Sequence, residues 1–547
     1  MVKAMRISLV WVALFYCAVP AVAQKSTRWE RLLGIPAGQK LAPPLPAPEG
    51  FQDHVVNGKL ALSLDDAIRL AFANNTDIRI DESSVRSAEN NLHRQFQVFD
   101  PVFTSSFNDQ QTKSATSTQL QGAPVLNTLS QATQFGYAQT FAPGTNFQTS
   151  FSANKFSTNS SFSFLNPSFT TTWQFTVTQP LLRNFGLFPN RAPILIAQRS
   201  LRQTQASFQA EVSDILLQVI TQYWNVTLAR ENLVVQKKSY EEAQQSYEHD
   251  KKALGLGALP PLDIYRSESQ VASRRVNVIQ AEYGLKQAED LLRQIIGADR
   301  DPDIRAFDLE LTEDPAPRDA MISPDIATVL ATALANRPEM EMARQQLAAD
   351  DMSVRLAHNN LRPDLRLTGQ YSTNGLGGNE YSTATPPVLI SAGGIGDSLN
   401  QLFNFKYPTY GAILSLTLPV KNHGAEADLG DARANRNRDQ YQQEKTRQTI
   451  TLQVTNAVHL LEEAKLSLEA AKIAVDLAEK TLQAEERKYT LGSSTVFFVL
   501  DAQTQLAQAE FSLAQAQTDY QSAVASVDDA TGMLLEHHRI EIVLATK

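Results

Sequence analysis

The sequence LDDAIRLAFANN at residues 64–75 has a counterpart, IATVLATALANR, at residues 326–337. The same gapless alignment places Pro101-Val-Phe103 on Pro363-Asp-Leu365. Each copy predicts a short amphipathic helix and then a helix of roughly 25 residues, which ends where the proline interrupts the helical period. An internal duplication decides the fold, because each half must then follow one structural plan.

Very long helices are expected in both halves. The stretches at about 191–252 and 425–489 contain one proline, Pro193, and no cluster of loop-forming residues. At 1.5 Å per residue, each predicts a helix roughly 90–100 Å long. Return helices rich in Ala and Gln are expected at about 262–296 and 499–531.

A heptad seam follows both long helices, because apolar residues recur at spacings of three and four. An ordinary antiparallel coiled coil has the same seam, so the helices alone do not decide the function. The seam residues are Tyr223, Val226, Leu233, Tyr240, Ala243 and Tyr247 in the first helix, and Leu461, Ala464, Leu468, Ala471, Val475, Ala478 and Leu482 in the second.

Between the helices the period changes to two. In the stretch FTTTWQFTVTQ at residues 169–179, aromatic and apolar residues alternate with Thr and Gln. Strands of about ten residues with one aromatic face and one polar face are typical of outer-membrane β-barrels. A half-buried soluble sandwich has the same alternation. Strands are expected at about 101–110, 133–141, 145–156 and 169–179 in the first half, and at about 365–372 and 409–418 in the second.

The connections between strands differ in length. Ala142-Pro-Gly-Thr145 predicts a tight turn, whereas residues 110–130, 157–168 and 372–408 are long and rich in loop-forming residues. Outer-membrane barrels have short periplasmic turns and long external loops. The ends of the sheet that carry the helices are therefore expected on the periplasmic side.

The N-terminus has the order of a secretory signal. Two basic residues, Lys3 and Arg6, precede an apolar run at about 7–19 and the small residues Ala21-Val-Ala23. This order predicts cleavage after Ala23. A transmembrane anchor is the alternative, but a helical span needs about 20 apolar residues.

The only cysteine, Cys17, lies inside this leader, so the mature chain is expected to have no disulfide. A lipoprotein is a further alternative, although Phe15 and Tyr16 are bulky where a lipobox has small residues. No later segment reaches about 18 uninterrupted apolar residues, so any crossing of a membrane must use a β-barrel.

Composition excludes several classes of protein. The 547 residues are 43% hydrophobic and 20% charged, which is typical of a folded chain. The net charge of −9 argues against nucleic acid as a partner. We find no phosphate-binding glycine loop, no zinc-protease motif and no nucleophile elbow, so no enzyme activity, cofactor or metal is expected. Zinc-site spacing is also missing among the histidines, which are His54, His93, His249, His358, His423, His459, His537 and His538.

The whole plan resembles the TolC family of outer membrane efflux proteins. The resemblance is carried by the duplicated order of helices and strands and by three short motifs, QPLLRNFG at 179–186, YTLG at 489–492 and VLDAQ at 499–503. It implies an internally duplicated α+β membrane protein, in which a trimeric outer-membrane β-barrel continues into a long periplasmic α-helical barrel of coiled-coil hairpins. It also implies a homotrimer that docks onto a periplasmic adaptor (membrane fusion) protein and an inner-membrane pump, for efflux or type I secretion without catalysis.

This resemblance divides the chain into six parts. They are a signal peptide at 1–23, a periplasmic segment with a Pro-rich linker at 24–62, a first repeat at 63–300, a connector at 301–321, a second repeat at 322–533, and a tail at 534–547. Within the repeats, helices are expected at 63–99 and 322–361, β segments at 101–179 and 363–419, and long helical hairpins at 190–297 and 424–532.

The resemblance also suggests where the periplasmic entrance narrows. Family members place aspartates in the helix after the second tip; Asp501 matches one such position, whereas Phe498 stands where another aspartate would lie. Asp263 is the counterpart from the first copy. An acidic ring would favour cations, but a carboxylate near a helix N-terminus is also explained by the helix dipole alone. An arginine that holds the entrance shut in some members is replaced by Ser494.

The turns of the two hairpins are the candidate adaptor contacts. Leu254-Gly255 and Leu491-Gly492 lie at these tips. A glycine at a helix-hairpin turn needs no partner to explain it.

One feature departs from the family, whose members supply two strands per half, since the first half here predicts four. We hypothesise that all six strands join an enlarged barrel. The rival hypothesis is a barrel of twelve strands with the extra hairpin, at about 133–156, folded outside it.

Two other functions remain in view. A periplasmic coiled-coil adaptor or scaffold without a pore would explain the helices but has no need of aromatic-faced strands. A secreted hydrolase is disfavoured because no catalytic motif is found. The substrate is not readable from the residues, because a duct of this kind takes its specificity from the pump it serves.

Overall fold

The computed structural model describes residues 47–116, 121–256, 261–317, 321–382, 388–540 and 542. The predicted signal peptide, Cys17 and the part of the linker before residue 47 lie outside the described residues. The chain divides into two compact units, at residues 1–48 and 49–547. Everything that follows concerns the second unit.

Each half begins with two helices that end where the sequence predicts a boundary. In the first half, the Ser63 hydroxyl and the Asp66 carboxylate form a reciprocal capping box that starts α3 (Leu64–Asn74). The Asn75 side chain then accepts from two backbone amides and starts α4 (Thr76–Gln95). The second half repeats this order with α8 (Ile326–Asn336) and α9 (Pro338–Asn360).

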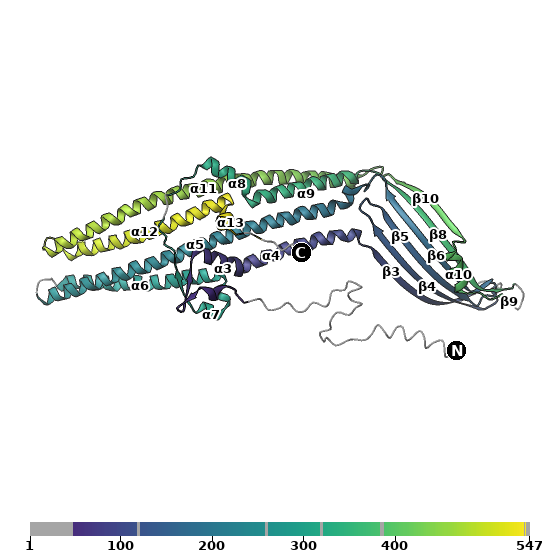
Figure 1. Ribbon diagram of the computed structural model, residues 1–547, viewed down its shortest axis with the longest axis horizontal. Coiled ribbons are helices and arrows are strands. Elements are labelled where there is room, and N and C mark those ends of the chain that lie inside the picture. The colour runs from purple at the N-terminus through teal and green to yellow at the C-terminus, as the bar shows by residue number, and fades with distance from the viewer. Residues whose placement is uncertain are drawn as a thin grey trace. The chain divides into compact units, whose positions relative to one another are not determined.

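Two long helical hairpins follow the strands of the two halves (Figure 1). The first consists of α5 (Leu187–Gly255) and α6 (Pro261–Ile296), and the second of α11 (His423–Thr490) and α12 (Val496–Thr531). Each long helix begins and ends within a few residues of its predicted bounds. Among the described residues, no helix is both long and apolar enough to cross a membrane.

The heptad seam of α11 forms a packed interior with α12. Leu461, Leu468 and Leu482 are buried, and Val475 and Ala478 are partly buried against them. In α5 the seam is less regular, because Tyr240 and Tyr247 are only partly buried and the small Ser239 is buried beside them. Large aromatic rings cannot all enter a close helix pair, which is why the prediction was less accurate there.

The six long strands form a large antiparallel sheet in the order β10-β8-β6-β5-β4-β3. A short strand, β9 (Leu389–Ser391), pairs with the outer end of β8. The hairpin of β4 and β5 therefore lies inside the sheet, between β3 and β6, and is not folded outside it. The long strands are β3 (Val102–Ala115), β4 (Val125–Thr140), β5 (Asn146–Thr158), β6 (Leu165–Pro180), β8 (Asp364–Tyr381) and β10 (Pro408–Thr417).

Five of the six long strands are longer than predicted, and the stretches expected as long loops contain strand or helix. The expected loop at 110–130 holds the ends of β3 and β4, and the one at 157–168 holds the start of β6. The expected loop at 372–408 holds the outer part of β8, β9 and a helix, α10 (Ile395–Phe403). These outer parts are rich in Ser, Thr, Asn and Gly on both faces, so the period of two that signals a strand disappears there.

The register of the sheet places most aromatic side chains on one face. We call this the aromatic face: Phe103, Phe135 and Phe151 lie side by side across β3, β4 and β5, with ring centroids 6.3 and 6.4 Å apart. The opposite, polar face is lined by Thr, Ser and Gln. The aromatic face also carries Phe147, Trp173, Phe175, Val177, Leu367, Tyr371, Tyr410 and Leu414, and the polar face carries Thr104, Gln134, Gln148, Gln174, Thr176 and Gln370.

A second, small sheet was not predicted. It joins β1 (Val55–Val56) and β2 (Lys59–Leu62) to β7 (Asp308–Leu311), with β2 and β7 parallel. The Tyr223 hydroxyl of α5 donates to the Leu62 carbonyl at 3.1 Å. Strands of two to four residues carry too little periodicity to be found in a sequence.

Short helical turns complete the described chain. They are η2 (Phe51–His54), η3 (Phe96–Phe99), η5 (Ala298–Arg300), α7 (Pro302–Arg305) and α13 (Leu534–His537).

Candidate functional site at the helical tips

The two hairpin tips lie at the end of the helices that is remote from the large sheet (Figure 1). Leu491 follows the last residue of α11, and 82% of its surface is exposed. In the first hairpin, Gly255 is the exposed last residue of α5 and Leu254 is half-buried beside it. Leu256, which follows α5, is 86% exposed, so both tips present a leucine side chain to solvent.

Gly492 is held in a conformation that favours glycine. Its φ of 74° lies in the left-handed region, and its amide donates to the Tyr489 carbonyl at 2.9 Å. The amide of Ser493 donates to the Lys488 carbonyl at 2.9 Å, so the last carbonyls of α11 are satisfied by the turn. The backbone of the tip explains Gly492 by itself, and its role as an adaptor contact stays a prediction.

The candidate constriction residues are divided between the two hairpins. Asp501 and Phe498 lie one turn apart on α12, and both are exposed. The Gln505 amide donates to the Asp501 carboxylate at 2.7 Å, and the Phe498 ring meets Phe497 edge-on at 5.4 Å. Asp263 lies at the start of α6, in the other hairpin, and its side chain is outside the described residues. A narrowed entrance built from these residues stays a prediction.

A buried carboxylate that the sequence analysis missed joins the two hairpins. Asp250, near the end of α5, is fully buried. It accepts a hydrogen bond from the Ser267 hydroxyl of α6 and another, 3.1 Å long, from the Tyr489 hydroxyl of α11. The ring of His249 also packs edge-on against Tyr489, with centroids 5.8 Å apart.

The signal for Asp250 was present in the sequence. Tyr240, Ala243 and Tyr247 define the seam of α5, and Asp250 occupies its next position. A carboxylate on an apolar seam is costly to bury without partners. Its presence there predicts hydrogen-bond donors on the neighbouring helices.

Further polar contacts tie α12 to the first hairpin. The Lys238 ammonium of α5 lies 2.6 Å from the Glu510 carboxylate, and this hydrogen bond raises the pKa of Lys238. The Arg274 guanidinium of α6 donates to the Thr504 hydroxyl. With the Asp250 contact, these bonds hold the tip regions of the two hairpins together.

Ser494, which the resemblance places at the position of a closing arginine, makes a local contact. Its hydroxyl donates to the Glu485 carboxylate at 2.9 Å, within the same hairpin. Hydrogen bonds from Lys488 and then from Ser494 lower the pKa of Glu485. In this structure Ser494 braces its own tip.

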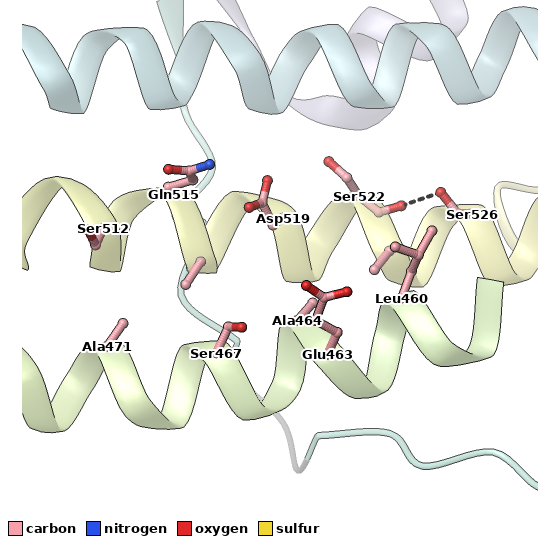
Figure 2. Close-up of a pocket in the computed structure, with 12 residues that line it drawn as sticks. Leu460, Glu463, Ala464, Ser467, Ala471, Ser512, Gln515, Asp519, Ser522 and Ser526 are labelled. Atoms are coloured by element: carbon pink, nitrogen blue, oxygen red, sulfur yellow. Dashed lines mark hydrogen bonds between the residues drawn. The ribbon is translucent and has the colours of Figure 1, made fainter. Parts of the chain in front are cut away.

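A groove of about 500 Å³ runs between α11 and α12, well above the tips. Figure 2 shows the carboxylates of Glu463 and Asp519 on the two facing helices, among small side chains such as Ser467 and Ser512. Burial, and then the charge of Glu463, raise the pKa of Asp519. The groove therefore holds two carboxylates whose negative charges repel each other.

A charged cluster lies where α8 and α9 meet the long helices. The Arg337 guanidinium donates to Glu339 at 2.9 Å and to Gln453 of α11 at 3.1 Å. The Ser213 hydroxyl of α5 donates to Asp529 of α12 at 2.7 Å. Burial raises the pKa of Asp529, although the Ser213 hydrogen bond and Arg337 oppose it.

Asp214, next to Ser213, has a similar shift. Burial, and then the negative charges of Asp529, Glu211 and Glu339, raise its pKa to about 6. The described part of the chain holds no group of three or more His, Cys, Asp or Glu side chains that could bind a metal ion.

The family model of the "Outer membrane efflux protein" matches residues 67–298 and 329–533, one match in each half of the chain. The chain belongs to the outer membrane efflux protein family. The resemblance to the TolC family and the outer-membrane location are thereby confirmed.

Two curated relatives align with about three fifths of the chain. The chain is 26% identical over 333 residues to outer membrane protein TolC of Escherichia coli (strain K12), a match that covers 60% of this chain and 64% of that protein. It is 21% identical over 355 residues to nodulation protein T of Rhizobium leguminosarum bv. trifolii, covering 64% and 69%. The chain thus aligns with less than two thirds of the length of TolC.

Solved structures confirm the fold over nearly the whole chain. The Campylobacter jejuni CmeC outer membrane channel superposes with a TM-score of 0.62 at 16% identity, covering 95% of this chain and 94% of that one. The Neisseria gonorrhoeae MtrE outer membrane channel, in its open state, gives 0.58 at 18% identity, covering 91% and 98%. The expected α+β duct fold is confirmed by these likenesses.

Proposed function

We propose that three copies of this protein form an exit duct of an efflux or type I secretion system. The duct would carry substrates from the periplasm, or from an inner-membrane pump, across the outer membrane. Family membership and the fold of solved outer membrane channels support this proposal. The observation that carries it is the large sheet, which has two open edges and two chemically different faces.

The two edge strands of the large sheet each have one side without a paired strand. Every residue of β3 and of β10, the two edge strands, is exposed. Unpaired edge strands invite pairing with another chain, and closure into a barrel removes them. β3 runs away from the helices and β10 runs toward them (Figure 1), so β10 of one copy and β3 of the next would pair antiparallel, like every other pair in the sheet.

The two faces suit lipid and water. Rings and aliphatic side chains such as Phe135, Trp173 and Leu414 on the aromatic face would meet the acyl chains. Thr104, Gln148 and the other residues of the polar face would line an aqueous passage. A membrane sheet with this alternation has the arrangement of known outer-membrane barrels.

Six strands from each of three copies would give an eighteen-stranded barrel. The twelve-stranded alternative requires the β4–β5 hairpin to leave a sheet in which it pairs with β3 on one side and β6 on the other. Barrels of sixteen to eighteen strands leave an aqueous channel between their walls. We therefore propose a wide external mouth.

At the other end, the exposed tips would meet the partners. Leu254, Gly255, Leu491 and Gly492 would contact a periplasmic adaptor protein that connects the duct to an inner-membrane pump. Asp501, with Asp263, would give the entrance a negative potential. Energy and catalysis would come from the pump, and the duct itself would need no cofactor.

Disulfide trapping across the proposed copy-to-copy seam tests this function. The mature chain has no cysteine if the leader is removed, so engineered pairs report cleanly. Ser106→Cys on β3 would be combined in turn with Thr409→Cys, Gly411→Cys and Ile413→Cys on β10, since all four positions lie on the polar face. We expect one register to give a covalent trimer in the outer-membrane fraction.

The matched control pairs Ser106→Cys with Gln174→Cys in β6, an interior strand of the sheet. This pair should give no covalent trimer. If every β3–β10 pair stays monomeric while the protein reaches the outer membrane, the closed trimer is refuted. A soluble periplasmic species would favour the scaffold without a pore.

A further inference from the structure

We propose that α10 and the residues after it, Asn404–Tyr407, form a membrane-interface anchor on the outside of the sheet. Phe403, Phe405 and Tyr407 would lie in the boundary between headgroups and acyl chains of the outer leaflet. This inference rests on the proposed function, because the aromatic face must first face lipid.

The helix is docked on the aromatic face. The Thr171 hydroxyl of β6 lies 2.7 Å from the Ser398 hydroxyl, and the Thr373 hydroxyl of β8 donates to the Leu402 carbonyl at 3.3 Å. All four residues are buried. Buried hydrogen bonds of this kind fix the helix to the sheet, so α10 is part of the sheet's surface and not a free external loop.

Two glycines of β8 make room for this contact. A Cβ at Gly375 would lie 1.9 Å from the Ser398 carbonyl oxygen, and one at Gly377 would lie 2.3 Å from the Gly394 carbonyl oxygen. Any side chain there would push the helix off the strand. The sequence of β8 is therefore adapted to hold α10 against the face that we assign to lipid.

The helix runs along β8 toward the aromatic rings of the aromatic face. Ser398 lies over Gly375, Leu402 over Thr373 and Phe405 near Tyr371, which are successive positions on the aromatic face. The ring of Phe403 meets Trp173 of β6 edge-on at 6.1 Å. The end of α10 thus adds aromatic rings to the upper part of the aromatic face.

These added rings are open to the surroundings. The exposed fractions are 56% for Phe403, 48% for Phe405 and 51% for Tyr407. Between residues 388 and 407, Asp397 and Lys406 are the only charged residues. A segment this apolar and exposed is unusual for a loop that faces water.

The chemistry fits the outer membrane interface better than a protein partner. Aromatic rings with a polar end gather at membrane interfaces, where one part meets acyl chains and the other meets water. The Lys406 ammonium lies 5.5 Å from the centre of the Tyr407 ring and is exposed, so it can reach an anionic lipid phosphate. The rings of Phe403 and Phe405 also adjoin aromatic rings of the aromatic face and do not form a separate patch.

Fluorescence quenching in vesicles tests the anchor. Single cysteines would replace Phe403, Tyr407, Leu414 or Ser372 in the full-length trimer, be labelled with an environment-sensitive fluorophore, and be reconstituted in phosphatidylethanolamine and phosphatidylglycerol vesicles. Lipids with a nitroxide near the headgroup or at the chain end, and aqueous iodide on both sides, serve as quenchers. We expect Phe403→Cys and Tyr407→Cys to lose most fluorescence to the headgroup nitroxide.

The other two sites separate this inference from the proposed function. Leu414→Cys, on the aromatic face, should be quenched most by the chain-end nitroxide, and Ser372→Cys, on the polar face, only by iodide. The anchor is overturned if the chain-end nitroxide quenches Leu414→Cys while only iodide quenches Phe403→Cys and Tyr407→Cys. That result would leave the proposed duct intact. Protection of both sites from all quenchers would mean that a neighbouring copy covers them, which also overturns the anchor. Iodide quenching at Leu414→Cys would show that the aromatic face meets water. It would contradict both the proposed barrel and the anchor.

Discussion

At the scale of single residues, the two tips contain glycines that look equivalent in the sequence but differ in the structure. Gly492 has a φ of 74°, whereas Gly255 ends α5 without a left-handed backbone, and no atom lies within 4 Å of a Cβ added to either one. Only the backbone separates the two positions.

The difference in backbone conformation makes Gly492→Ala and Gly255→Ala a matched pair of variants. Gly492→Ala should weaken the second tip by about 1 kcal/mol, because an L residue is strained in the left-handed region. Amides near residues 488–495 should then exchange about fivefold faster with deuterium. Gly255→Ala should leave exchange at the first tip unchanged. Equal effects of the two substitutions would show that the φ of Gly492 has no role.

Leu491 tests whether the second tip contacts an adaptor. Leu491→Glu places a charge on a residue that is already 82% exposed, so the fold should be unaffected. We expect crosslinking to the periplasmic adaptor to fall sharply, with Leu452→Glu, on the exposed side of α11, as the control. Undiminished crosslinking of Leu491→Glu would remove this residue from the docking surface.

Asp501 tests the acidic entrance. Asp501→Ala removes an exposed carboxylate from α12 and should reduce the preference for cations, seen as a smaller reversal potential in a salt gradient across a planar bilayer. Asp431→Ala, an exposed carboxylate of α11 remote from the tips, is the control. Unchanged ion selectivity in Asp501→Ala would show that this carboxylate does not select ions and is explained by its position near the helix N-terminus.

At the scale of elements, the contact between α5 and α11 decides how firmly the two hairpins are held. Tyr489→Phe removes only the hydroxyl that donates to Asp250 at 3.1 Å. A buried acceptor that loses one of its hydrogen-bond partners costs about 1–3 kcal/mol. We expect the two hairpins to separate more readily at their tips and, in the proposed duct, single-channel conductance to rise.

The control for this variant lies on the same helix. Tyr441→Phe removes a hydroxyl from a residue with most of its surface exposed, and conductance should not change. If Tyr489→Phe conducts like the natural protein, Asp250 is a stability contact only.

The same scale contains a pH effect. The pKa values of Asp214 and Asp529 are raised in the folded protein, that of Asp214 to about 6. The folded state therefore binds more protons than the unfolded state between about pH 4 and 6, so the stability from this cluster is present below about pH 4 and is lost as the pH rises through 6.

Asp214→Asn should flatten this dependence and raise the unfolding temperature of the solubilised protein at pH 7. The effect should be small, because Asp214 is exposed to water and its charge is screened. Asp431→Asn should keep the natural dependence. A slope for Asp214→Asn as steep as that of the natural protein would show that this carboxyl is not responsible.

Elements also show what a sequence can and cannot predict. The long helices were predicted well because heptads such as Leu461 to Leu482 bury one face over many turns. The outer ends of β3 and β8 were missed because both of their faces are polar. The helix α10 was missed because it packs against glycines of β8 and does not bury a long apolar stripe. Asp250 lay on a visible seam, but its partners Ser267 and Tyr489 come from helices whose pairing no local pattern reveals.

At the scale of the whole molecule, the number of strands sets the width of the proposed duct. Replacing residues 116–164 with an Asn-Gly turn would remove β4 and β5 and join β3 directly to β6. A trimer of this variant would have twelve strands, and its mouth would shrink to about two thirds, because barrel diameter grows roughly linearly with strand number.

Neutral polymers added from the outer side would measure this change. We expect the largest polymer that alters the conductance to be smaller for the variant, provided that it still assembles as a trimer by mass. An unchanged polymer limit in an assembled trimer would contradict a barrel built from all six strands.

The parallel pair of β2 and β7 in the small sheet has a consequence for the order of folding. Leu62, at the end of β2, and Thr312, next to β7, lie 250 positions apart, and the Thr312 hydroxyl donates to the Leu62 carbonyl. A chain exported from its N-terminus delivers β2 long before β7, and contacts between distant segments form slowly. The first strands to arrive, β1 and β2, can pair with each other at once, but β2 must keep one edge open until the whole first repeat has followed it and β7 can add to that edge.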